Sequence, residues 1–215
     1  MRSMVFAEAL LPEGWHRDVR VEVDADGRIA TVTPDAGPGR LVALPGMPDL
    51  HSHAFQRGMA GLTEVAGTGE DSFWTWRDWM YRFALALDPE DVEAIAALAY
   101  VEMLEAGFTT VGEFHYIHHD RDGRPYADPA ELGRRCVAAA EATGLAITLL
   151  PVFYAHSGFG GQAPGEGQRR FICDLDSFAR LLRNAGSWTL WGYGTFMVRL
   201  KGQERIIANC GVFRS

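Results

Sequence analysis

His51 and His53 are the residues of this sequence best suited to chemistry. They follow directly on an apolar run, residues 41–50. Side chains two residues apart on an extended backbone point to the same side, so both imidazoles can reach one point at the strand's end. Two imidazoles are half of a site for Zn²⁺ or a similar divalent metal, which further His, Asp or Glu ligands and a water complete in catalytic sites. A pair of surface histidines is the alternative, and the buried-type strand and the polar Asp49 favour the metal.

The composition is typical of a globular protein and excludes some partners. The chain has 215 residues, of which 47% are hydrophobic and 22% charged, with a formal net charge of −8. That charge argues against nucleic acid or an anionic membrane as a partner, because both select basic surfaces. No apolar run approaches the roughly 20 residues of a membrane span, and no signal-like stretch opens the chain. Three scattered cysteines imply no disulfide framework, so we expect a cytoplasmic protein.

Residues 1–45 predict a small β unit. Residues 18–23 alternate polar and apolar side chains, residues 24–27 form a turn, and residues 28–32 return as a second strand. Residues 34–39 are rich in Gly and Pro and read as a linker.

From about residue 41 the sequence predicts strands that alternate with helices. Two of the expected helices start with Asp-Pro followed by an acidic residue, at residues 88–91 and 128–131, and end at glycine, Gly107 and Gly144. The predicted strands are 41–51, 108–114 and 145–152, and the predicted helices are 72–87, 89–106, 129–143 and 169–182.

Continuously apolar strands spaced by helices indicate an α/β fold with a parallel sheet covered on both faces. An open doubly wound sheet and a closed (β/α)₈ barrel both fit this order. Polar residues at the carboxyl ends of successive strands favour the barrel, whose active sites lie at that edge. Three of the eight βα units of a barrel are visible. The polar residues concerned are His51, His53, Glu113, His115, Tyr116, Tyr154 and His156.

The motif at residues 45–53 resembles the amidohydrolase superfamily of metal-dependent hydrolases. Residues 53–58, 73–80 and 112–120 are similar to its formimidoylglutamate deiminase family. This resemblance covers residues 1 to about 183. It implies part of a small β-sandwich over residues 1–45, the first three βα units of a (β/α)₈ TIM-type barrel over 46–183, and an atypical tail over 184–215.

The resemblance also implies roles for five residues. His51 and His53 match the first two ligands of one Zn²⁺ per complete site. Gln56, Arg77 and Tyr116 match positions that line the substrate pocket. A small-molecule dicarboxylate substrate needs a guanidinium that binds carboxylates in a bidentate manner, as Arg77 can. A solvated helix arginine stacked on tryptophan is the alternative for Arg77, and a structural role is an even alternative for Tyr116 and Gln56.

The rest of the expected site lies elsewhere. In the family, histidines and an aspartate from later strands complete the metal site, and the catalytic proton-transfer groups also come from there. The cluster His115, His118 and His119 is interpreted as a polar loop, and no ligand role is assigned to His156. Residues 187–215 carry one acid, Glu204, against four basic residues. We interpret this tail as a frameshifted or truncated reading frame, with a genuine fourth βα unit as the alternative.

Three functions stay open at this stage. The resemblance favours a hydrolase that converts N-formimino-L-glutamate and water to N-formyl-L-glutamate and ammonia in histidine degradation, a homodimer when full-length. This truncated chain is expected to be inactive. A deaminase of a purine or related ring is a second reading, against which Arg77 counts, because a neutral ring needs no guanidinium. A non-catalytic fragment is the third.

Overall fold

The computed structural model describes residues 2–63, 73–158, 160–184, 195–199 and 206–211. The chain divides into two compact units, Met1–Met47 and Pro48–Ser215. The described residues form an α/β protein, in agreement with the predicted fold class.

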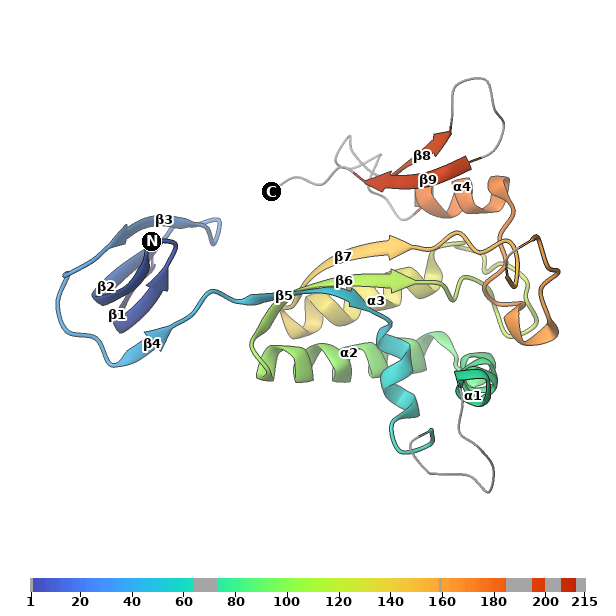
Figure 1. The fold of residues 1–215 in the computed structure, drawn as a ribbon, viewed down its shortest axis with the longest axis horizontal. Helices are drawn as coiled ribbons and strands as arrows, with labels where there is room; N and C mark the ends of the chain where they lie inside the picture. The colour runs from blue at the N-terminus through green and yellow to red at the C-terminus, as the bar shows by residue number, and fades with distance from the viewer. Residues whose placement is uncertain (1, 64–72, 159, 185–194, 200–205, 212–215) are drawn as a thin grey trace. The chain divides into compact units, whose positions relative to one another are not determined.

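The first unit is a four-stranded sheet with the strand order β3-β2-β1-β4 (Figure 1). β1 pairs antiparallel with β2 and parallel with β4, and β2 pairs antiparallel with β3. The strands are β1 (Arg2–Leu11), β2 (Gly14–Val23), β3 (Ile29–Thr33) and β4 (Leu41–Ala43).

The predicted hairpin is confirmed by β2 and β3, and its turn has a clear chemical origin. The Asp24 carboxylate accepts hydrogen bonds from the backbone N–H groups of Asp26 and Arg28, each at 2.9 Å. Gly27 has a φ of +79°, which a glycine adopts without strain. An acidic side chain at the start of the turn and glycine at its tightest point therefore set this reversal.

The second unit alternates strands and helices. In chain order its elements are β5 (Met47–Ser52), the 3₁₀ helix η1 (Ala54–Met59), α1 (Phe73–Ala86), α2 (Pro89–Glu105), β6 (Phe108–His115), α3 (Glu131–Thr143), β7 (Ala146–Pro151), the 3₁₀ helix η2 (Glu166–Gln168), α4 (Leu175–Asn184), β8 (Thr195–Arg199) and β9 (Ile206–Gly211).

The strands β5, β6 and β7 form one sheet in that order, and β6 and β7 run parallel. Figure 1 shows α2 and α3 lying together along this sheet. Their buried faces meet in a core that includes Val92, Leu132 and Cys136. This sheet brings the ends of β5, β6 and β7 to the edge where the predicted polar residues lie.

α2 begins and α3 ends where the sequence predicts, whereas α3 begins at Glu131, two residues later than predicted. The Asp88 carboxylate caps α2 by accepting a hydrogen bond from the backbone N–H of Asp91 at 2.9 Å. The Asp91 carboxylate in turn accepts a hydrogen bond from the backbone N–H of Asp88 at 3.0 Å. Pro89 follows at the first helical position. Gly144 ends α3 in the left-handed conformation, with a φ of +83°.

The predicted single strand 41–51 is wrong. Residues 44–46 separate β4 from β5, and the two strands belong to different sheets. Pro45 has no N–H to donate to a ladder, which favours a break there. The prediction that other elements cover this strand on both faces is also wrong for the described residues, because the side chain of Leu41 is 67% exposed and that of Leu50 is 77% exposed. β5 is an edge strand of the three-stranded sheet, so its apolar side chains lack a neighbour on one side.

The predicted helix 169–182 begins six residues late. α4 starts at Leu175, after Asp174, whose carboxylate accepts the backbone N–H of Ser177 at 2.7 Å. The preceding segment is non-helical because Arg170 is fully buried there and donates to the backbone carbonyls of His119 and Leu87, at 2.7 and 2.8 Å. A tertiary contact therefore overrides the helical pattern.

In the tail, β8 and β9 pair antiparallel. The tryptophan-rich stretch at residues 187–193 lies outside the described residues. No helix in the described part of the chain is both long and apolar enough to cross a membrane.

Candidate metal half-site and adjoining pocket

The imidazoles of His51 and His53 converge at the end of β5. Their Nε2 atoms are 3.1 Å apart, and the rings meet edge to face with centroids 4.7 Å apart. Two Zn–N bonds of about 2.0–2.1 Å at a tetrahedral angle separate two nitrogens by about 3.3 Å. The observed pair can therefore hold one zinc ion with little movement.

The neighbouring strand sets the chemical state of His53. Its Nδ1 lies 2.7 Å from the carbonyl oxygen of Phe114 on β6. A carbonyl only accepts, so Nδ1 carries the proton and Nε2 presents its lone pair toward His51. Burial, with a smaller contribution from the charge of His51, lowers the pKa of His53 and favours the neutral form that binds metals.

The ring of Phe114 also orients His51. The two ring centroids are 4.2 Å apart and the planes are tilted by 31°. The preceding residue, Glu113, is 1% exposed, and its Oε1 accepts the backbone N–H of Ala54 at 2.8 Å. Burial raises the pKa of Glu113. β6 therefore holds two parts of this segment: Glu113 binds the backbone N–H of Ala54, and Phe114 binds the imidazole of His53.

Within the described residues, no group of three or more His, Cys, Asp and Glu is placed to hold a metal ion. We therefore expect dialysed chain to retain well below one zinc per molecule. In a zinc titration by calorimetry, His53→Ala should weaken the residual binding by a hundredfold or more, since even losing an outer partner of a metal ligand costs about 10–100-fold.

His156→Ala is the matched control, because its side chain is exposed on a loop. It should leave zinc binding unchanged. A stable content of one zinc per chain, lost in His156→Ala, would show that the loop after β7 completes the site.

Gln56 and Tyr116 lie together beside the histidine pair. The Gln56 Nε2 donates to the Tyr116 hydroxyl at 2.7 Å, and the Tyr116 ring meets the His53 ring edge to face at 4.9 Å. Burial raises the pKa of Tyr116, which keeps its phenol protonated. The Tyr116 hydroxyl also lies 3.8 Å from the sulfur of Met80 on α1.

Arg77 lies three residues before Met80 on α1 and lines an open pocket of about 520 Å³. Its guanidinium lies over the ring of Tyr81, 5.5 Å from the centroid. Ser157 and Gln168 line the same pocket from the segment after β7. The structure thus brings Gln56 and Tyr116 to the histidine pair, whereas Arg77 lines a pocket that includes neither of them.

The three histidines at and after the end of β6 do not form the expected polar loop. His115, His118 and His119 are 5%, 1% and 9% exposed. The Nε2 of His118 lies 2.8 Å from the Val152 carbonyl oxygen, and that of His119 2.7 Å from the Ile172 carbonyl oxygen. These histidines hold the segment after β6 against the segments after β7 and are packed inside the protein.

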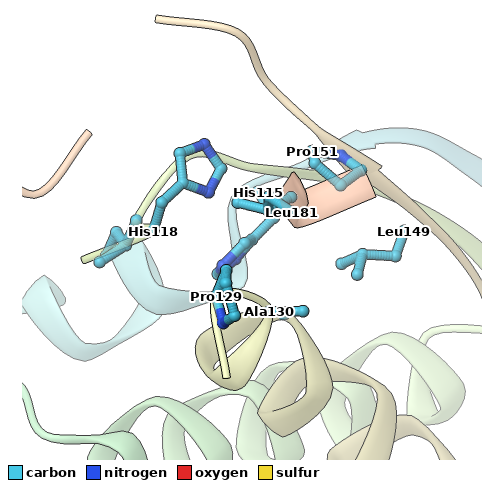
Figure 2. Close-up of a pocket in the computed structure, with 9 residues that line it drawn as sticks. His115, His118, Pro129, Ala130, Leu149, Pro151 and Leu181 are labelled. Atoms are coloured by element: carbon cyan, nitrogen blue, oxygen red, sulfur yellow. The ribbon is translucent and has the colours of Figure 1, made fainter. Parts of the chain in front are cut away.

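His115 and His118 flank a small cavity of about 10 Å³ (Figure 2). Its other lining residues include Leu149 and Leu181. A space of this size holds at most one water molecule, so it is too small for a substrate.

Some residues of this region can be identified from the sequence and others cannot. Glu113 can, because it is a carboxylate inside an apolar strand. Tyr81, Gln168 and Arg170 cannot, because their roles depend on contacts between α1 and the segment after β7. Among the predicted polar residues, His156 is exposed in the loop after β7.

Comparisons with known proteins agree with this arrangement. Residues 42–193 match the amidohydrolase family, and residues 2–40 match the N-terminal domain of the formimidoylglutamate deiminase HutF. A curated formimidoylglutamate deiminase from Pseudomonas aeruginosa is 60% identical over 187 residues, which are 84% of this chain and 41% of the relative. The chain thus spans less than half the length of that relative.

Solved structures show the same fold. An amidohydrolase from Brucella melitensis is 53% identical, with a TM-score of 0.80 over 86% of this chain and 42% of that one. The atrazine chlorohydrolase TrzN from Arthrobacter aurescens, solved with zinc, has a TM-score of 0.64 at 16% identity over 89% of this chain and 43% of its own. Because the family match covers well over half of the sequence, the chain belongs to the amidohydrolase family.

Proposed function

We propose that this chain is the N-terminal part of a metal-dependent deiminase that converts N-formimino-L-glutamate and water to N-formyl-L-glutamate and ammonia in histidine degradation. The observation that carries the proposal is the 60% identity to a curated formimidoylglutamate deiminase. In this proposal the second unit is part of a (β/α)₈ barrel, and the first unit is part of a small β-sandwich. The whole enzyme is a cytoplasmic homodimer that binds neither nucleic acid nor membranes, in keeping with the net charge of −8.

The proposed metal is zinc, held by His51 and His53 together with ligands from elsewhere in the enzyme. The 3.1 Å separation of the two Nε2 atoms supports this assignment, as does the zinc in the solved relative TrzN. When bound, the metal supplies a nucleophilic water near neutral pH and polarises the electrophilic carbon. Phe114 keeps the Nε2 of His53 deprotonated through the bond to Nδ1.

Arg77, Gln56 and Tyr116 are proposed to bind the two carboxylates of the substrate. A guanidinium binds a carboxylate through two parallel hydrogen bonds, and Arg77 lines the large open pocket. Gln56 and Tyr116 lie next to His53, so in this proposal they orient the end of the substrate that is nearest the metal. The proton-transfer groups are proposed to come from outside this chain. A neutral purine ring would offer Arg77 no carboxylate to bind.

A chimera tests the function directly. Residues 1–183 of this chain replace the matching part of the Pseudomonas aeruginosa relative, and ammonia release from N-formimino-L-glutamate is measured. We expect the chimera to hold zinc and to turn over at a rate comparable to that of the parent. A folded chimera that holds one zinc per chain and releases no ammonia would contradict the proposal.

Arg77→Met in this chimera should raise KM about 30-fold with zinc content unchanged, since losing a charge-assisted contact costs about 2 kcal/mol or more. Arg180→Met, an exposed arginine on α4, is the matched control and should leave the kinetics unchanged. Equal kinetics for both variants would show that Arg77 is only a surface arginine.

A further inference from the structure

Gln168 is a buried amide in the wall of the Arg77 pocket. It ends η2, is 4% exposed, and lines the pocket together with Arg77 and Tyr81. Burying an amide costs free energy unless its N–H donors and its oxygen are all hydrogen-bonded. The hydrogen-bond partners of Gln168 therefore indicate its role.

The partners of Gln168 fix the orientation of its amide. The backbone N–H of Gly165 donates to Oε1 at 2.8 Å, which makes this atom the carbonyl oxygen. The Nε2 group therefore faces the other way, 3.1 Å from the Tyr81 hydroxyl and 2.8 Å from the Tyr154 hydroxyl. An amide NH₂ only donates, so both phenol oxygens act as acceptors toward Gln168.

This arrangement leaves both phenol protons over. The Gln168 Nε2 group offers only donors to the Tyr81 and Tyr154 oxygens, so neither phenol proton can go to it. Burial, with a smaller contribution from Tyr154, raises the pKa of Tyr81 to about 12, so the Tyr81 phenol stays protonated near neutral pH.

The ring of Tyr81, one of the two phenols, lies next to a positive charge. The Arg77 guanidinium lies 5.5 Å from the centroid of the Tyr81 ring, and both residues line the same pocket. A hydroxyl donor beside a guanidinium is a favourable environment for a carboxylate oxygen, because hydrogen bonds to charged acceptors are the strong ones.

A second glutamine–tyrosine pair lies beside the histidine pair. Gln56 donates to the Tyr116 hydroxyl at 2.7 Å, and that hydroxyl in turn faces the sulfur of Met80 at 3.8 Å. Phe171 lies between the two places, with its ring 5.1 Å from that of Tyr116, 5.7 Å from that of Tyr81 and 5.8 Å from that of Tyr154. In both places a glutamine amide occupies the phenol oxygen, and at Tyr116 the phenol proton is then directed to another partner.

We propose that Gln168 is a positioning residue that directs a Tyr81–Tyr154 hydroxyl into the pocket as a donor to the substrate carboxylate bound by Arg77. The inference deepens the proposed function and rests on it. Gln168 itself does not touch the carboxylate in this scheme; it acts through the two phenols.

The test uses the 215-residue chain and glutarate, a simple dicarboxylate, with binding followed by tryptophan fluorescence, since Trp76 and Trp79 lie beside Arg77 on α1. Gln168→Met keeps the bulk and removes the amide, and we expect it to weaken glutarate binding about tenfold. Gln162→Met is the matched control: its side chain is exposed on the same loop, and binding should not change.

A double-mutant cycle separates positioning from simple loop stability. Tyr81→Phe with Tyr154→Phe removes both hydroxyls and keeps the rings, so it should weaken binding as much as Gln168→Met. Adding Gln168→Met to that background should then have no further effect. Additive losses would show that Gln168 only holds the loop, and would overturn the inference.

The outcomes distinguish this inference from the proposed function. Loss of glutarate binding in Arg77→Met with none in Gln168→Met would overturn the role of Gln168 and leave that of Arg77 intact. Failure of the unsubstituted chain to bind glutarate would also overturn the inference, whereas the function is judged by ammonia release from the chimera.

Discussion

Arg170→Met is expected to lower the free energy of unfolding of the second unit by about 4 kcal/mol, because each buried acceptor left without a donor costs about 1–3 kcal/mol. Arg170 has no exposed surface. Its guanidinium donates to the carbonyls of Ala84 and Leu87 at the end of α1, to that of His119 after β6, and to the Tyr126 hydroxyl. Removing it leaves the buried carbonyl oxygens of Ala84 and His119 without this donor, while that of Leu87 keeps a longer bond from Arg121 at 3.3 Å.

Urea unfolding followed by helical circular dichroism measures this loss, since all described α-helices lie in the second unit. Arg124→Met is the control: its side chain is 86% exposed and pairs with Asp122 only at the surface, which is worth about 0–1 kcal/mol. Arg170→Lys should recover part of the loss. Equal stability of Arg170→Met and Arg124→Met would mean that the buried network contributes nothing.

The second unit is also expected to lose about 4 kcal/mol between pH 7 and pH 5, through His115 and His118. Burial, together with the charge of His118, lowers the pKa of His115 to about 3; burial lowers that of His118 to about 4. Figure 2 shows both rings at the wall of the small cavity. The unfolded chain binds protons at these sites below its ordinary pKa of about 6.5, and the folded chain does not. Stability is therefore complete above pH 6.5 and falls as the pH drops toward 4.

Urea unfolding at a series of pH values tests this slope. His118→Gln keeps a donor for the Val152 carbonyl and removes one titrating group, so the loss between pH 7 and pH 5 should fall by about half. His156→Gln, at an exposed loop position, should leave the slope unchanged. A pH dependence that is the same in all three proteins would contradict the assignment.

Local chemistry made much of the fold predictable. The capping box at Asp88, the left-handed Gly144 and the Asp24 turn all act within a few residues of themselves, so the sequence around them carries the information. The same holds for the convergence of His51 and His53, because two residues on one strand share a face.

Apart from the break at Pro45, which is local, the failures depend on residues far apart in the sequence. The start of α4 depends on Arg170 binding carbonyls more than 50 residues away. The histidines after β6 look polar in the sequence, yet they are buried against the segments after β7. Gln168 has no local signal, because its partners come from α1 and from the end of β7.

The contacts of Phe114 have a consequence for when the histidine pair becomes ordered. Its carbonyl fixes one imidazole and its ring fixes the other, and both contacts form as β5 and β6 come together in the sheet. The rotational freedom of the two side chains is therefore lost during folding and not when an ion arrives. Ion capture at this pair is then opposed mainly by the loss of the ion's hydration, with little entropy left to lose in the protein.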